Sequence, residues 1–151
     1  MVVTDGDGNR RVVRQGTNAL VCSPEGPAPG FSVNCSDESI RRSGDVPTAL
    51  TQYGTLRAQG LPEDEILARI SAGVKDGSLA PIVAGAMHLI VSGPDKEHTE
   101  LLVVIRLPDA TAESTGLSTE PSEDQAWLMF SGTHQAHVMI GSPPYGWSPN
   151  K

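Results

Sequence analysis

Aromatic and basic residues are scarce in this sequence, and their scarcity excludes several classes of protein. Only 4% of the 151 residues are aromatic, so a hydrophobic core must consist mainly of aliphatic side chains and methionine. Lys and Arg number 11 against 18 Asp and Glu, and the formal net charge is −7. A nucleic-acid or anionic-membrane partner requires a net basic face, so we expect neither. No apolar run approaches the roughly 20 residues of a membrane-spanning helix.

The signature motifs of common enzymes are missing as well. The sequence contains no G-x-S-x-G nucleophile elbow, no G-x-G-x-x-G that opens a helix and no phosphate-binding P-loop. The two cysteines lie too far apart for a C-x-x-C redox pair. A hydrophobic content of 38% is nevertheless sufficient for a true core. We therefore expect a single domain over residues 1–151 whose activity no motif identifies.

Cys22 and Cys35 flank residues 23–30, which are rich in proline and glycine. Because such a segment has little regular structure to hold it, we predict a disulfide, which would stabilise a loop of this size by about 3 kcal/mol. Two unlinked buried thiols are one alternative. A zinc site that joins both cysteines to His88 and His137 is another, and it would exclude the disulfide.

The amino-terminal segment is polar and contains no signal peptide. Two locations are then open: the cytosol, or an exported protein whose signal peptide has been removed. The cysteine pair favours export, so we expect a periplasmic or secreted protein.

The first half of the chain predicts a hairpin, a long loop and two helices. Residues 2–15 form the hairpin, with a turn at 5–9 whose Asp and Asn spacing resembles an EF-hand loop without its required Gly and Glu. Residues 16–47 are expected to be mostly loop. Helices are predicted over 47–59 and, more clearly, over 62–77, whose apolar stripe should pack on a sheet.

The second half predicts strands, in the order 82–91, 101–107, 126–131 and 136–140. The segment 101–105 is apolar on both faces, which indicates a central strand covered on each side; one possible arrangement is a helix on one face and a second sheet on the other. Residues 108–124 form a long polar loop, and residues 141–151 an irregular tail that Tyr145 and Trp147 would pin to the body. The expected fold is α+β and mostly antiparallel β, sandwich-like or an open barrel, with one or two helices.

Two of the predicted strands share a histidine motif. His88 and His137 each open an apolar run of three residues that ends in small residues and a proline. If the two strands are neighbours, both imidazoles lie on one face, as ligands for zinc, copper or iron or as a proton-handling pair. His134 joins them only if a tight turn precedes it, because a spacing of three points side chains to opposite faces of a strand. The alternative is that these histidines are hydrogen-bonded to the backbone at the edge of the core.

The two ends of the chain resemble a family of small secreted bacterial proteins without an assigned function. Family members open with G-T-N-G-W-x-C after a short hairpin and close with A-G-T-x-x-A-H-L-M-I. The matching segments here are Gly16-Thr17-Asn18 before Cys22, the loop to Cys35, and residues 127–140. Ala19-Leu20-Val21 replaces the Gly-Trp portion, and residues 37–79 match poorly. The resemblance implies an exported protein with a cleaved signal and a disulfide, and it implies no activity.

From these patterns we expect a domain that binds a small ligand or metal ion beside His88 and His137. Residues 108–124 would lie over the mouth of this site and Trp127 would form an apolar wall. One alternative is an enzyme that uses a histidine as general base on a small substrate. Another is a structural or interaction module with no small-molecule site, in which exposed strands form a dimer.

Overall fold

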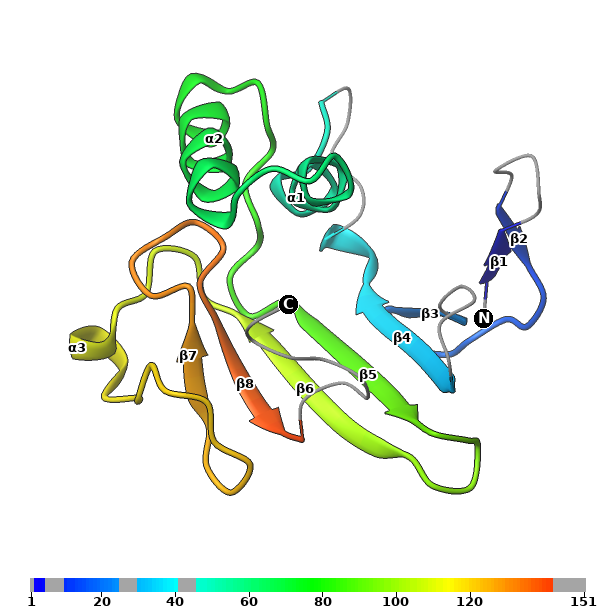
Figure 1. Cartoon of the computed structure of the whole chain (residues 1–151). Helices are drawn as coiled ribbons and strands as arrows, with labels where there is room; N and C mark the ends of the chain where they lie inside the picture. Colours follow the sequence, from blue (N-terminus) through cyan, green and yellow to red (C-terminus); the bar gives the residue numbers. More distant parts are fainter. Residues whose placement is uncertain (1, 5–9, 25–29, 41–45, 143–151) are drawn as a thin grey trace.

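The computed structural model describes residues 2–4, 10–24, 30–40 and 46–142. A six-stranded antiparallel sheet with the strand order β3-β4-β5-β6-β8-β7 forms the body of the molecule (Figure 1). Its strands are β3 (Leu20–Pro24), β4 (Phe31–Asp37), β5 (Met87–Gly93), β6 (Glu100–Arg106), β7 (Trp127–Met129) and β8 (His137–Gly141). The expected α+β class with mostly antiparallel β structure is confirmed.

A second, smaller sheet pairs β1 (Val2–Thr4) with β2 (Arg10–Val12), which confirms the predicted hairpin. Its turn at residues 5–9 lies outside the described residues. This hairpin contacts the large sheet at its edge strand β3. The prediction of a second sheet stacked over strand 101–107 is therefore wrong for the described residues, because the β1–β2 pair lies beside the large sheet.

Two helices lie together at one end of the large sheet (Figure 1). Helix α1 (Ala49–Ala58) begins where the Thr48 hydroxyl accepts a hydrogen bond from the Thr51 amide. Helix α2 (Glu63–Asp76) has three acidic residues in its first turn and ends at Gly77, whose φ of 81° is accessible to glycine without strain. Both predicted helices are confirmed. Two short helical segments complete the chain, η1 (Glu38–Ile40) and α3 (Ala112–Thr115).

The apolar stripe of α2 packs against α1 instead of the sheet, which corrects the sequence-based prediction. Ile66 and Ile70 are almost fully buried, and each contributes roughly 1.5–3 kcal/mol by leaving water. They share one core cluster with α1 and with the segment after α2: Ala49, Leu56, Ile66, Ile70, Leu79 and Ile82. Of the two helices, α1 is the one whose side chains face the strands across a cavity, through Leu50, Tyr53 and Arg57.

The prediction that residues 16–47 are mostly loop is wrong for the part of this range that the structure describes. Strands β3 and β4 pair in antiparallel fashion, and Cys22 lies directly opposite Cys35. The two residues form a disulfide, as predicted. This bond rules out unlinked thiols and the mixed cysteine–histidine zinc site. Proline and glycine hide the strand signal, because they mark the segment between the strands and leave only short runs on either side.

Three boundaries differ from the predictions. The strand expected over 82–91 begins at Met87, because Ile82 packs into the helical core and Gly85 turns the chain at a φ of 82°. Residues 108–124 are partly structured: Thr111 caps α3 in a capping box, and Ser118 bridges to Trp127. Residues 143–151, with Tyr145 and Trp147, lie outside the described residues. In the described chain, no helix is both long and apolar enough to cross a bilayer.

The disulfide predicts a measurable difference between oxidised and reduced protein. Replacing both cysteines (Cys22→Ser with Cys35→Ser) should lower the free energy of unfolding by about 3 kcal/mol, because the unfolded chain regains the entropy that the closed loop removes. Urea denaturation measures this change. Reductant should destabilise the natural chain and leave the double variant unchanged; equal sensitivity of both proteins would contradict the prediction.

Candidate functional site

The antiparallel register places His88 and His137 on the same face of the large sheet. His88 on β5 lies opposite Val104 of β6, and His137 on β8 lies opposite Arg106 of β6. Each histidine lies near the start of its strand, as the sequence predicts: His137 is the first residue of β8, and His88 follows Met87, the first residue of β5. The two strands are not neighbours, however, because β6 runs between them and brings Arg106 to the same face. A cationic side chain thus lies next to one of the two imidazoles.

This face and α1 line a half-open cavity of about 180 Å³. Both histidines line the cavity, so the structure brings together the pair that the sequence singled out. Helix α1 covers it with Leu50, Tyr53 and Arg57. The other lining residues come from the sheet and from the turn before β8: His88, Ile90, Leu102, Val104, Arg106, Met129, Phe130, Gln135, His137 and Met139.

The ring of His137 is buried and neutral. Its Nδ1 lies 2.7 Å from the carbonyl oxygen of Gln135, and because a carbonyl only accepts, Nδ1 carries the proton. Burial and, to a smaller extent, the nearby Arg106 charge together lower the pKa of His137 to about 4, against the opposing effect of the Gln135 hydrogen bond. The ring therefore offers a lone pair on Nε2 at neutral pH.

Arg106 is a buried cation without an acidic partner among the described residues. Only 7% of its surface is exposed, and its Nε has no hydrogen-bond partner. Its Nη1 lies 3.2 Å from Nδ1 of His137, but that nitrogen already donates to Gln135, so the contact satisfies neither group. Burial lowers the pKa of Arg106 to about 10, and the guanidinium keeps its charge at neutral pH.

An aromatic row forms one wall of the cavity. The ring of Phe130 lies 6.0 Å from that of Tyr53 and 5.6 Å from that of His137, edge to face with the imidazole. Tyr53 donates its hydroxyl proton to Glu63 at 2.7 Å. Burial and this carboxylate raise the pKa of Tyr53 above its ordinary value, so the phenol remains protonated.

The turn before β8 positions this wall. Phe130 has a φ of 57°, a left-handed conformation that costs a residue with a side chain roughly 1–2 kcal/mol. The amide and hydroxyl of Thr133 both donate to the Phe130 carbonyl and hold the turn. Gln135, which is fully buried, donates from Nε2 to the Ala49 carbonyl at 3.0 Å and ties the turn to the start of α1.

His134 points away from the cavity. Its Nε2 accepts a hydrogen bond from the Ile82 amide at 3.0 Å, and its Nδ1 lies 3.5 Å from a carboxylate oxygen of Asp109. The structure thus separates His134 from His88 and His137. The sequence analysis requires a tight turn before His134 if it is to join the other two histidines. A turn is present there, but it directs His134 to the Ile82 amide and away from the cavity.

Trp127 and residues 108–124 also lie outside the lining of the cavity. Trp127 is buried in a cluster with Leu102, Val104 and Met139, so it supports the wall from within the core. The cover over the cavity is α1, whereas the expectation was residues 108–124. That segment follows β6 to the edge of the sheet beyond β7, where α3 lies (Figure 1).

No group of three or more His, Cys, Asp or Glu side chains in the described ranges is arranged to hold a metal ion. The cavity itself contributes two imidazoles and two arginines and no carboxylate. A divalent cation at His137 would face the Arg106 charge directly. The chemistry of this donor set is that of a site for an anion.

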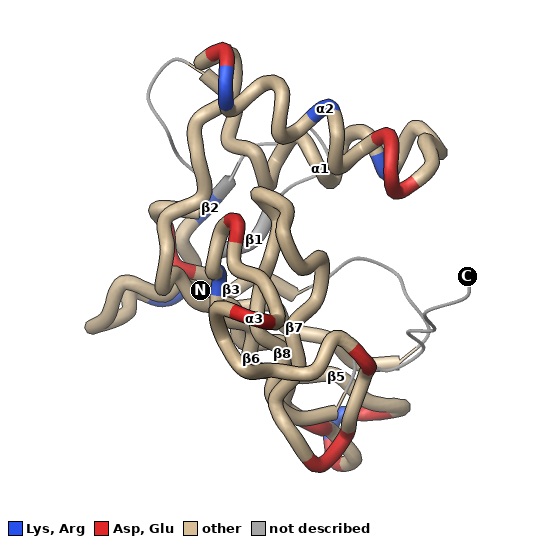
Figure 2. The backbone as a smooth tube through the Cα atoms, turned by 90° about the vertical axis from the view of Figure 1, so that its left-hand side faces the viewer, with Lys and Arg blue, Asp and Glu red and all other residues tan. Residues whose placement is uncertain are grey.

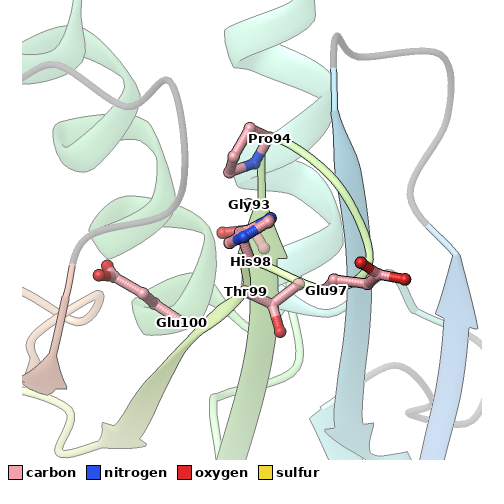
Figure 3. A pocket seen from close by; sticks show the side chains of 7 residues that line it. Gly93, Pro94, Glu97, His98, Thr99 and Glu100 are labelled. Atoms are coloured by element: carbon pink, nitrogen blue, oxygen red, sulfur yellow. The ribbon is translucent and has the colours of Figure 1, made fainter.

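A second pocket, of about 380 Å³, lies at the turn between β5 and β6 (Figure 3). Asp95 accepts from Nδ1 of His98 at 2.9 Å and from two backbone amides of the same turn. The His98 side chain is 72% exposed, and the contacts are local to the turn. The pocket contains no buried charged group, so we assign it no function.

Comparisons with protein-family models, curated proteins and solved structures find no match to this chain. The likeness to a secreted bacterial family therefore stays a prediction.

Two residues of the cavity escape the sequence analysis. Arg106 ends an apolar strand, where a basic residue ordinarily marks the return to solvent, and Tyr53 is one apolar position in a weakly periodic helix. The apolar run over residues 101–105, directly before Arg106, is a weak signal for a buried position, because it places Arg106 at the end of a core strand.

The lowered pKa of His137 predicts how stability depends on pH. Between pH 6.5 and 4 the unfolded chain binds a proton at this residue and the folded chain does not, so stability falls as the pH falls. The loss should be on the order of 3 kcal/mol when pH 4 is reached. Urea denaturation from pH 7 to pH 4 measures it, and His137→Asn should flatten the slope.

Carboxyl groups with lowered pKa values, such as Asp95 and Glu113, add to the loss as the pH approaches 4, because the unfolded chain takes up protons there before the folded chain does. The difference between the natural chain and His137→Asn therefore isolates the contribution of the imidazole. Nuclear magnetic resonance of the imidazole nitrogens gives the site directly, with the proton on Nδ1. A His137 resonance that titrates near pH 6.5 would contradict a buried neutral ring.

Proposed function

We propose that this chain is an exported domain that binds a small organic carboxylate in the cavity between α1 and the large sheet. Arg106 is the group that holds the carboxylate, and His88 and His137 contact the rest of the ligand. The observation that carries the proposal is the buried guanidinium of Arg106, which lines a cavity and has no acidic partner among the described residues.

The energetics of burial favour a charged ligand. Removing a cation from water costs several kcal/mol unless an opposite charge and hydrogen bonds compensate. The folded chain bears this cost at Arg106, because its near neighbour is the neutral ring of His137. A carboxylate accepts two parallel hydrogen bonds from a guanidinium and supplies the missing charge. Arg57, at the α1 side of the cavity, adds a second positive charge.

The size of the cavity limits the ligand. A volume of about 180 Å³ is below the ~300–1,000 Å³ typical of pockets for drug-sized molecules. The apolar part of the lining, which includes Ile90, Leu102 and Met139, suits a short hydrocarbon portion. Among small acids, the ring of Phe130 then selects by shape. The lone pair on Nε2 of His137 selects acids that carry a hydrogen-bond donor.

The alternative of a histidine general base is less favoured at His137. A general base works best when its pKa lies near the working pH, and the pKa of His137 is lowered to about 4. A ring this weakly basic accepts a hydrogen bond without removing a proton. Binding is therefore the function that the geometry supports best.

Export is part of the same proposal. The disulfide between Cys22 and Cys35 fits an oxidising compartment, since disulfides in reducing compartments are rare. Small carboxylates are common nutrients and products outside the cell membrane, so a domain that captures them has a use there.

The proposal predicts that one substitution affects ligand binding and protein stability in different ways. Arg106→Met should abolish binding of small carboxylates, with at least a ~10–100-fold rise in Kd because charge-assisted hydrogen bonds are lost. The same change should leave the ligand-free protein at least as stable, since it removes a buried charge without a partner. Calorimetric titration with acetate, lactate, succinate and benzoate measures the first effect, and urea denaturation measures the second.

Arg69→Met is the matched control, because Arg69 lies exposed on α2 and pairs with Glu65 of its own helix. It should change neither binding nor stability appreciably. The proposal fails if none of the four acids binds the natural chain, or if Arg106→Met binds them as well as the control does.

A further inference from the structure

The face of the large sheet opposite the cavity is a continuous apolar surface. Because side chains alternate along a strand, the residues between those of the cavity point to this other face. We call it the open sheet face and define it by ten residues of β3, β4, β5, β6 and β8: Cys22, Val33, Cys35, Met87, Leu89, Val91, Leu101, Val103, Ile105 and Ile140.

The two faces of the sheet differ in exposure. On the cavity face, residues such as Leu102, Val104 and Met139 are buried. On the open sheet face, Met87, Leu101 and Ile140 are 38%, 49% and 41% exposed, and its other members are all half-buried. The surface ends at the β7 side of the sheet, where Leu128 and Val138 are buried.

The open sheet face is uncharged except at one corner. None of its ten residues is acidic or basic, and the one charged residue that the same alternation adds on this side of the strands, Asp37 opposite Leu20, lies at the end of β4. Figure 2 shows acidic and basic residues gathered on the helices and turns. Two copies of an acidic chain repel each other over most of their surfaces, and this face is where they meet without opposing like charges.

The face is also large enough for a specific interface. Strands β4, β5 and β6 have seven residues each, about 23 Å at ~3.3 Å per residue, and five strands span about 24 Å. Since β3 and β8 are shorter, this gives roughly 500 Å² on each copy, or about 1,000 Å² for two. That total reaches the lower bound of specific protein interfaces.

We infer that the open sheet face binds a second copy of this chain, sheet against sheet, in a two-fold symmetric dimer. Two such faces pack about 10 Å apart with their strands within roughly 30°, as in a β-sandwich. The two-fold axis lets the same surface serve both copies. The row that crosses the face, Cys35, Leu89, Val103 and Ile140, lies at the centre of the contact. The inference is independent of the ligand in the cavity.

A pair of charge substitutions tests this inference. Leu101→Lys combined with Ile140→Lys places four like charges in the dimer interface and should raise the dimer Kd at least ~100-fold. Sedimentation equilibrium over micromolar concentrations should give twice the chain mass for the natural protein and the chain mass for the variant. Far-ultraviolet circular dichroism checks that the variant is folded.

Val83→Lys is the control. Val83 is 51% exposed, about as much as Leu101, and it does not belong to the open sheet face. This variant should remain a dimer. A natural chain that is monomeric at every concentration would overturn the inference, and so would a dimer that persists in the double variant. Dimers that form only after removal of residues 143–151 would overturn it too, since that segment would then be the occupant of the face.

Discussion

The antiparallel pairing of β5, β6 and β8 determines which side chains can act together in this protein. Residues 102–105 of β6 have a partner on both neighbouring strands, and adjacent residues along the strand point to opposite faces. One set of side chains, with His88, Arg106 and His137, is placed under α1. The other set, with Leu101 and Val103, is placed on the open sheet face. A shift of one residue in this register would exchange the two sets and destroy both surfaces.

Arg106 shows that the cavity is not simply a packing defect. A sheet built for stability alone would place an aliphatic residue at this buried position, as it does at Leu102 and Val104 on the same strand. The molecule instead holds a guanidinium against a neutral imidazole, in a cavity that also has an aromatic wall. Functional sites are where such local costs accumulate, and the left-handed Phe130 beside Arg106 is a second cost of the same kind.

The sequence predicts what depends on local patterns. Both helices, four of the strands, the hairpin and the disulfide follow from periodicity, capping residues and composition. The shared cavity face of His88 and His137 follows from their common motif. What the sequence does not predict depends on long-range pairing: β6 lies between the two histidine strands, and α1 instead of residues 108–124 covers the cavity. Strands β3 and β4 also escape prediction, because Pro and Gly between them mask a short pairing that the Cys22–Cys35 bond holds.

The turn from Phe130 to Gln135 has a mechanical consequence. It bonds to the start of α1 through Gln135, and His134 bonds to the segment after α2 through the Ile82 amide. Hydrogen bonds from two consecutive residues, His134 and Gln135, thus hold the helical part of the chain to the turn before β8. Any displacement of α1 would break the hydrogen bond from Gln135 to Ala49, and Gln135 belongs to the same turn that holds Phe130 in its left-handed conformation. The start of α1 and the aromatic wall of the cavity are thus mechanically coupled.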